Sequence, residues 1–187
     1  MFNRFLPFFQ FLPLSFFSTY AFWHGQVSNE RWLDAFQVSA LLAVVQLAYF
    51  VRSKQVMSRL ILSANLYLIL GGSAALLQQW WLFDVYEKLQ ESAIFLIMIV
   101  VGLLTTIYSE YGFVGVVDVN SQQIKKASTW LLLATVFALI LSIYLQGQIT
   151  LSTVVPIICL ALMQRYLAFN ITSPNRLFNF TKQVEAR

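Results

Sequence analysis

Long apolar runs separated by short polar breaks dominate the chain. Six stretches are predominantly apolar over about 20 residues, which is the length that a helix needs to cross a hydrocarbon core of about 30 Å. They are Phe5–Trp23, Trp32–Val51, Leu60–Trp80, Ser92–Tyr108, Ala127–Leu145 and Ile149–Leu167. The pattern predicts an all-α polytopic bundle of six transmembrane helices.

The first apolar stretch begins as a secretory signal would, with one arginine followed by a phenylalanine-rich run. It ends in bulky residues rather than in a small-residue cleavage site, and further apolar stretches follow it, so we expect it to be retained. Pro13 lies in its middle, where proline removes a helical hydrogen bond and predicts a kink or break. A re-entrant first segment followed by five full crossings is therefore the alternative topology.

Two of the connections carry structural information. The break between the fifth and sixth stretches is only Gln146-Gly147-Gln148, which predicts antiparallel neighbouring helices. Residues 111–120 are apolar and contain two glycines. This segment either lies flat on the inner membrane surface or extends the fourth helix.

Composition supports a membrane protein. Hydrophobic residues make up 59% of the 187 residues and charged residues only 11%, whereas an ordinary soluble domain is roughly a quarter charged. We therefore predict one integral membrane domain over residues 1–187, with the lipid bilayer as its surroundings and a basic cytoplasmic tail at 173–187. The net charge of +4 is modest and gives no indication of a nucleic-acid partner.

The distribution of basic residues predicts the orientation. If the amino terminus is cytoplasmic, ten of the twelve Lys and Arg residues lie inside and only Arg31 and Lys88 lie outside. The inside residues are Arg4, Arg52, Lys54, Arg59, Lys125, Lys126, Arg165, Arg176, Lys182 and Arg187. Such a bias follows the positive-inside rule, so both termini are expected in the cytoplasm.

Tryptophan positions agree with this orientation. Indole rings favour the membrane interface, where the ring is half-buried and its N–H finds a partner. Four tryptophans fall at the predicted outer boundary and one near the inner boundary. These expected interfacial anchors are Trp23, Trp32, Trp80, Trp81 and Trp130.

Few side chains offer chemistry. His24 is the single histidine and lies at the expected outer end of the first stretch, whereas Cys159 lies within an apolar run and is expected to pack. Acidic residues avoid the middle of every stretch, which argues against an ion-coupled transporter. Arg165 is the deepest charge and is expected either to snorkel to the interface or to contact a lipid headgroup. We predict no enzyme, metal or cofactor site.

The third apolar stretch shows the clearest helical pattern. Asn65, Gly72 and Gln79 are spaced by seven residues and fall on one helix face, with Leu76 and Gly71 beside them. Glycine lets helix backbones approach, and an amide supplies an interhelical hydrogen bond in lipid. This face is predicted to pack against another helix or a partner protein.

Two further amides lie in the second stretch. Gln37 and Gln46 are candidate partners for the third stretch, because an unpaired amide in hydrocarbon is costly. The same amides also fit a polar pathway for a solute.

Several segments together resemble the intracellular septation protein A family of small bacterial inner-membrane proteins. The family's Phe-rich, proline-containing start is similar to residues 11–17, FLPLSFF, and its Gln-to-basic span end is similar to residues 46–54, QLAYFVRSK. A paired glycine is matched by Gly71-Gly72, an outer lysine before a helix by Lys88, and a basic loop leading to tryptophan by residues 125–130, KKASTW. The resemblance covers about residues 5 to 168.

This resemblance implies a non-enzymatic inner-membrane protein that supports envelope maintenance and septation or elongation. It would act through helix contacts with other inner-membrane proteins, such as division or wall-synthesis proteins, and a homo-oligomer fits the same surfaces. Two other classes are compatible with the residues: a small oligomeric transporter or channel, and a membrane enzyme acting on lipid or quinone.

Overall fold

The computed structural model describes residues 10–22, 29–53, 57–89, 92–117, 119–148 and 150–185, and every regular element in them is helical. This confirms the predicted all-α class. Internal contacts group the chain into two compact units, Met1–Ile97 and Met98–Arg187. The single domain expected from the sequence stays a prediction.

Four described helices are long and apolar enough to cross a membrane. They are Arg31–Ser53, Arg59–Leu76, Ser121–Tyr144 and Thr150–Thr172, and Ala93–Tyr108 is a shorter apolar helix. These five correspond to the second to sixth predicted stretches. The first predicted span lies partly outside the described residues, so the choice between six crossings and five stays a prediction.

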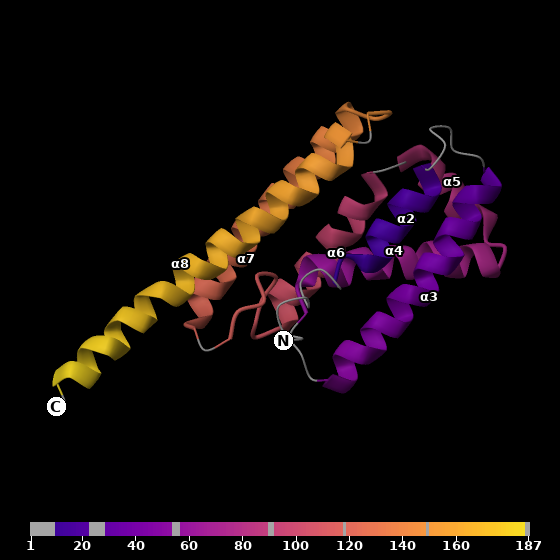
Figure 1. The fold of residues 1–187 in the computed structure, drawn as a ribbon. Helices are drawn as coiled ribbons and strands as arrows, with labels where there is room; N and C mark the ends of the chain where they lie inside the picture. Colours follow the sequence, from indigo (N-terminus) through magenta and orange to yellow (C-terminus); the bar gives the residue numbers. More distant parts are fainter. Residues whose placement is uncertain are drawn as a thin grey trace. The chain divides into compact units, whose positions relative to one another are not determined.

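The first unit contains the helices α2 (Leu12–Phe22), α3 (Asn29–Ser53), α4 (Arg59–Leu76) and α5 (Trp80–Leu89) (Figure 1). α3 and α4 form an antiparallel pair with the most extensive helix contact of the unit, and α2 packs on both. Rings from three helices meet there: the Phe17 and Phe36 centroids lie 4.6 Å apart, and Phe36 and Tyr67 lie 5.5 Å apart. This aromatic cluster fixes α2 against the α3–α4 pair.

Pro13 does not kink a helix within the described residues. The described helix α2 begins at Leu12, so Pro13 falls in its first turn, where the missing N–H has no intrahelical acceptor in any case. A break at Pro13 is compatible with this helix start, and because residues 1–9 lie outside the described residues, it stays a prediction.

The third predicted stretch ends earlier than its apolar character indicates. α4 stops at Leu76, and Gln78 adopts a left-handed φ of 52°. The Gln79 N–H bonds to the Ala74 carbonyl at 3.0 Å and the Gln78 N–H to the Ala75 carbonyl at 3.4 Å, which is the Schellman arrangement. The chain then turns into α5, so most of the predicted polar break after the third stretch is a short helix.

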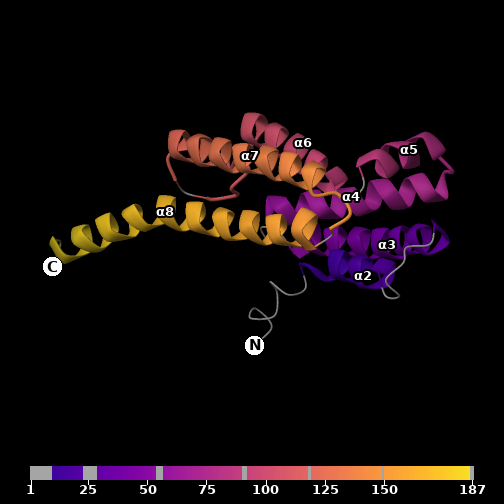
Figure 2. The same ribbon diagram turned by 90° about the horizontal axis from the view of Figure 1, so that it is seen from above.

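The second unit contains most of α6 (Ala93–Tyr108), then α7 (Ser121–Tyr144), the π-helical turn η3 (Thr150–Val154) and α8 (Val155–Glu185). α7 and α8 lie side by side, and α8 continues well past its neighbour (Figures 1 and 2). Gly147, with φ of 87°, forms the turn between them. The predicted antiparallel neighbours are confirmed, and α8 includes most of the predicted tail.

Residues 109–117 do not extend the fourth helix, which ends at Tyr108. Gly112 and Gly115 take positive φ values of 58° and 75° and reverse the chain direction. Phe113 is fully buried and Val114 is 3% exposed. This connection therefore packs inside the second unit, and the helix-extension alternative is wrong.

Candidate functional site

A partly buried amide pair joins α3 and α4 in the first unit. Asn65 is 1% exposed, and its Nδ2 donates to Gln46 Oε1 at 2.6 Å. The predicted partnership of Gln46 with the third stretch is thus confirmed. In an apolar interior each amide removes the cost of leaving the other unpaired.

The glycine pair lies on the same interface, toward the other end of α4. A side chain at Gly71 would collide with the Phe36 ring, and one at Gly72 would collide with Ala40 and lie 2.9 Å from the Phe36 carbonyl oxygen. The absence of a Cβ therefore sets how closely α3 approaches α4. Asn65, Gly71 and Gly72 form the predicted packing face, and that face is covered by α3.

Gln79 and Leu76 are not on this covered face. Gln79 lies beyond the end of α4, where its Nε2 donates to the Leu77 carbonyl at 3.3 Å and its Oε1 accepts from Trp81 Nε1 at 3.0 Å. Leu76 is 70% exposed. The seven-residue spacing predicted Gln79 on the same face as Asn65 and Gly72. This prediction is wrong because it assumes a helix that continues through Gln78, whereas α4 ends at Leu76.

The predicted polar pathway does not assemble in the first unit as a continuous row. Gln37 lies half-buried on α3, Gln46 and Asn65 bond to each other, and Gln79 lies in the turn after α4.

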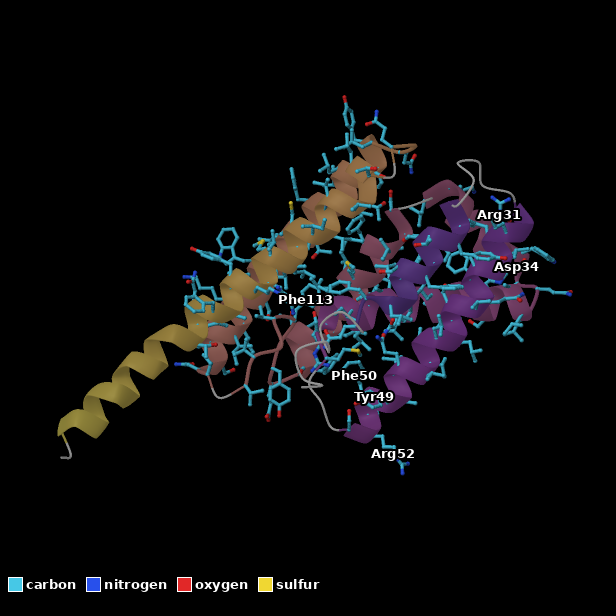
Figure 3. All side chains as sticks on the ribbon, viewed as in Figure 1. Arg31, Asp34, Tyr49, Phe50, Arg52 and Phe113 are labelled. Carbon is cyan, nitrogen blue, oxygen red and sulfur yellow. The ribbon has the colours of Figure 1, made fainter. Side chains whose placement is uncertain are left out.

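The charged and aromatic residues at the two ends of α3 are separated: Arg31 and Asp34 lie at one end, and Tyr49 and Arg52 at the other (Figure 3).

The predicted tryptophan anchors divide into two groups. Trp80, Trp81 and Trp130 are 60%, 62% and 55% exposed, as residues facing an interface would be. Trp32 instead packs at 5.2 Å from Phe36, centroid to centroid, and its buried indole N–H has no hydrogen-bond acceptor among the described residues. Trp23 and His24 lie outside the described residues.

Arg165 and Cys159 both lie exposed on α8, so Cys159 does not pack inside the described fold as expected. Arg165 follows Gln164, whose Nε2 donates to the Val114 carbonyl at 3.1 Å. Among the described residues, no group of three or more His, Cys, Asp or Glu side chains could hold a metal ion.

Sequence reasoning missed a polar centre in the second unit. The fully buried Ser128 on α7 accepts hydrogen bonds from the N–H groups of Phe113 at 2.9 Å and Val114 at 3.4 Å. Ser128, Thr135 and Ser142 are buried at seven-residue spacing along α7. The signal was the same spacing that marked the third stretch, but hydroxyl groups are less conspicuous than amides.

Comparison with known proteins adds no relative, because no protein-family model, curated protein or solved structure matches this chain.

Proposed function

We propose that the chain is a non-enzymatic, multi-pass protein of a bacterial inner membrane that supports envelope maintenance and septation. It acts through helix contacts with other membrane proteins, with both termini in the cytoplasm. The septation role rests on the resemblance to the intracellular septation protein A family, and the orientation rests on the charge distribution.

One observation carries the non-enzymatic part of the proposal. Within the candidate spans, the buried Asn65 side chain donates to Gln46 across the α3–α4 contact. The glycines beside it are covered by Phe36 and Ala40. These residues hold α3 to α4, so the polar residues that could have formed a site maintain the helix pair instead.

A partner protein must then contact a surface other than the α4 face that was predicted from the sequence. α8 has the most free surface of the four candidate spans: only 11% of its apolar window is buried, against 56% for α4. Ile158 and Leu162 are 53% and 60% exposed on it. We therefore place the partner contact on the outward side of α8.

Photocrosslinking in living cells tests this proposal. A photoreactive residue replaces Ile158 or Leu162 on α8, Leu41 on α3, or Asn65 in the buried face. Leu41 is 66% exposed and serves as the matched lipid-facing control. We expect division or wall-synthesis proteins to be captured from positions 158 and 162, and not from positions 41 or 65.

Two outcomes would contradict the proposal. Capture of the same proteins from position 41 would show random collision in the bilayer. Crosslinks only between copies of the chain would favour a homo-oligomer, which is the arrangement expected of a small channel.

A further inference from the structure

Two hydrogen bonds fix the level of α8 against α7 in the second unit. Val114 donates its N–H to Ser128 on α7 and accepts at its carbonyl from Gln164 on α8. Both bonds involve the backbone of one residue, so Ser128 and Gln164 lie at nearly the same height. The two helices run in opposite directions from this level.

Three cations fall close to that height. Lys125 and Lys126 precede Ser128 by three and two residues, or about 4.5 and 3 Å along the axis, and Arg165 follows Gln164 by about 1.5 Å. Because α7 and α8 are antiparallel, all three displacements point toward the same end of the unit. All three side chains are exposed.

Aromatic residues bracket this level. Trp130, 55% exposed, lies about 3 Å from Ser128 toward the apolar part of α7. Tyr166, 66% exposed, adjoins Arg165 on α8. Exposed indole and phenol groups next to cations are typical of the headgroup region of a bilayer.

We propose that Lys125, Lys126 and Arg165 form a cationic belt that binds the phosphate groups of anionic phospholipids in the cytoplasmic leaflet. The inference rests on the proposed membrane location. It assigns Arg165 to the membrane boundary, although the apolar window of α8 continues to Thr172. The crossing part then comprises η3 and α8 as far as Arg165, about 24 Å, and the remainder of α8 extends beyond the bilayer core.

The belt acts locally rather than through net charge. The sequence places Glu110 and Asp118 in the connection before α7, which offsets part of the positive charge. A cation near an anionic surface contributes about 1 kcal/mol, or about a 5-fold change in partition, as an upper value. We therefore expect a several-fold preference for anionic lipid around this unit.

Tryptophan quenching by brominated lipids measures that preference. A single-tryptophan protein keeps Trp130, with the other four replaced by phenylalanine, and is reconstituted in phosphatidylcholine vesicles. Equal mole fractions of brominated phosphatidylglycerol or brominated phosphatidylcholine are added. Stronger quenching of Trp130 by the brominated phosphatidylglycerol is expected.

Matched variants isolate the cations. In the triple variant Lys125→Gln, Lys126→Gln, Arg165→Gln, both brominated lipids should quench Trp130 equally. In the variant Lys125→Arg, Lys126→Arg, Arg165→Lys, the brominated phosphatidylglycerol should still quench Trp130 more strongly. A protein that keeps only Trp80, 60% exposed on α5, should show none. If the triple Gln variant loses helical circular dichroism, Arg165→Gln alone replaces it and should reduce the preference in part.

The proposal is overturned if Trp130 shows no more preference than Trp80, or if the Gln variants quench like the parent. These results are distinct from failure of the proposed function. Absence of quenching by either lipid at both tryptophans would reject the membrane location itself. Absence of protein partners on α8 would leave the lipid preference unchanged.

Discussion

Asn65 in α4 donates its side-chain amide to Gln46 in α3 at 2.6 Å, across two helices that are each apolar enough to cross a membrane. The bond joins positions 19 residues apart in sequence, is partly buried, and ties the helix pair together.

Substitution of this pair should be non-additive. Asn65→Ala and Gln46→Ala should each lower the free energy of unfolding, and the double variant should lose less than their sum, with a coupling of about 0.6 to 1.7 kcal/mol. Detergent-mixture unfolding of the four proteins measures it. Additive losses would mean that the amides do not support each other.

The two glycines should differ in their tolerance of alanine. At Gly71 the obstacle is the Phe36 side chain alone, whereas at Gly72 it includes the Phe36 backbone carbonyl. We expect Gly72→Ala to cost about 1–3 kcal/mol of unfolding free energy and Gly71→Ala less.

The second change Ala40→Gly removes the other obstacle at Gly72 and serves as the control. It should restore part of the stability that Gly72→Ala loses, and none of what Gly71→Ala loses. Equal effects at the two glycines would contradict the assigned packing.

The left-handed Gln78 offers a stabilising change. Glycine adopts φ of 52° without a Cβ penalty, so Gln78→Gly should raise the free energy of unfolding by about 0.5–1 kcal/mol. Gln78→Ile should lower it, because a branched Cβ fits this conformation poorly. Thermal unfolding in detergent checks both signs. A loss of stability with glycine would indicate that α4 continues past Leu76.

Ser128 should be far more sensitive than its neighbour Thr129. Ser128→Ala leaves the buried N–H groups of Phe113 and Val114 without their acceptor and should cost about 1–3 kcal/mol. Thr129→Ala removes an exposed hydroxyl that bonds only within its own helix, so it should change stability by less than about 0.5 kcal/mol. The two variants are compared by their free energies of unfolding and by their rates of proteolysis between Tyr108 and Ser121. Similar sensitivities would remove the role of Ser128 in holding the connection.

Water access distinguishes a helix-packing role from a solute pathway. In a Cys159→Ser background, Asn65→Cys should resist a membrane-impermeant thiol reagent, because residue 65 is 1% exposed. Gln148→Cys, in the exposed turn between α7 and α8, should react and serves as the control. Labelling at position 65 would favour the transporter alternative.

The sequence located the helices well because a chain with 59% hydrophobic residues has few ways to satisfy its backbone in lipid. It also offered Gln37 and Gln46 as candidate partners for the amides of the third stretch, since an unpaired amide is costly to bury, but it did not indicate that Gln46 would bond to Asn65. Helix ends were harder to predict: residues 77–80 are compatible with a continuing helix, and nothing in Gln78 indicates a left-handed turn.

The burial of Phe113 was equally inaccessible from the sequence. An apolar segment with two glycines satisfies the composition of a surface segment, a helix extension or an inserted connection. The choice depends on two tertiary hydrogen bonds that no local pattern encodes: the Phe113 N–H donates to Ser128, and Gln164 donates to the Val114 carbonyl.

The early end of α4 gives the protein helices of unequal length. α4 and α6 measure about 27 and 24 Å along their axes, whereas α3 and α7 measure about 37 and 36 Å. In a bilayer the longer helices must tilt or extend into the headgroups, while the shorter ones draw the lipid surfaces together. Because α4 and α6 are shorter than a hydrocarbon core of about 30 Å, we expect the stability of the protein to depend on bilayer thickness and to be greatest in thin membranes.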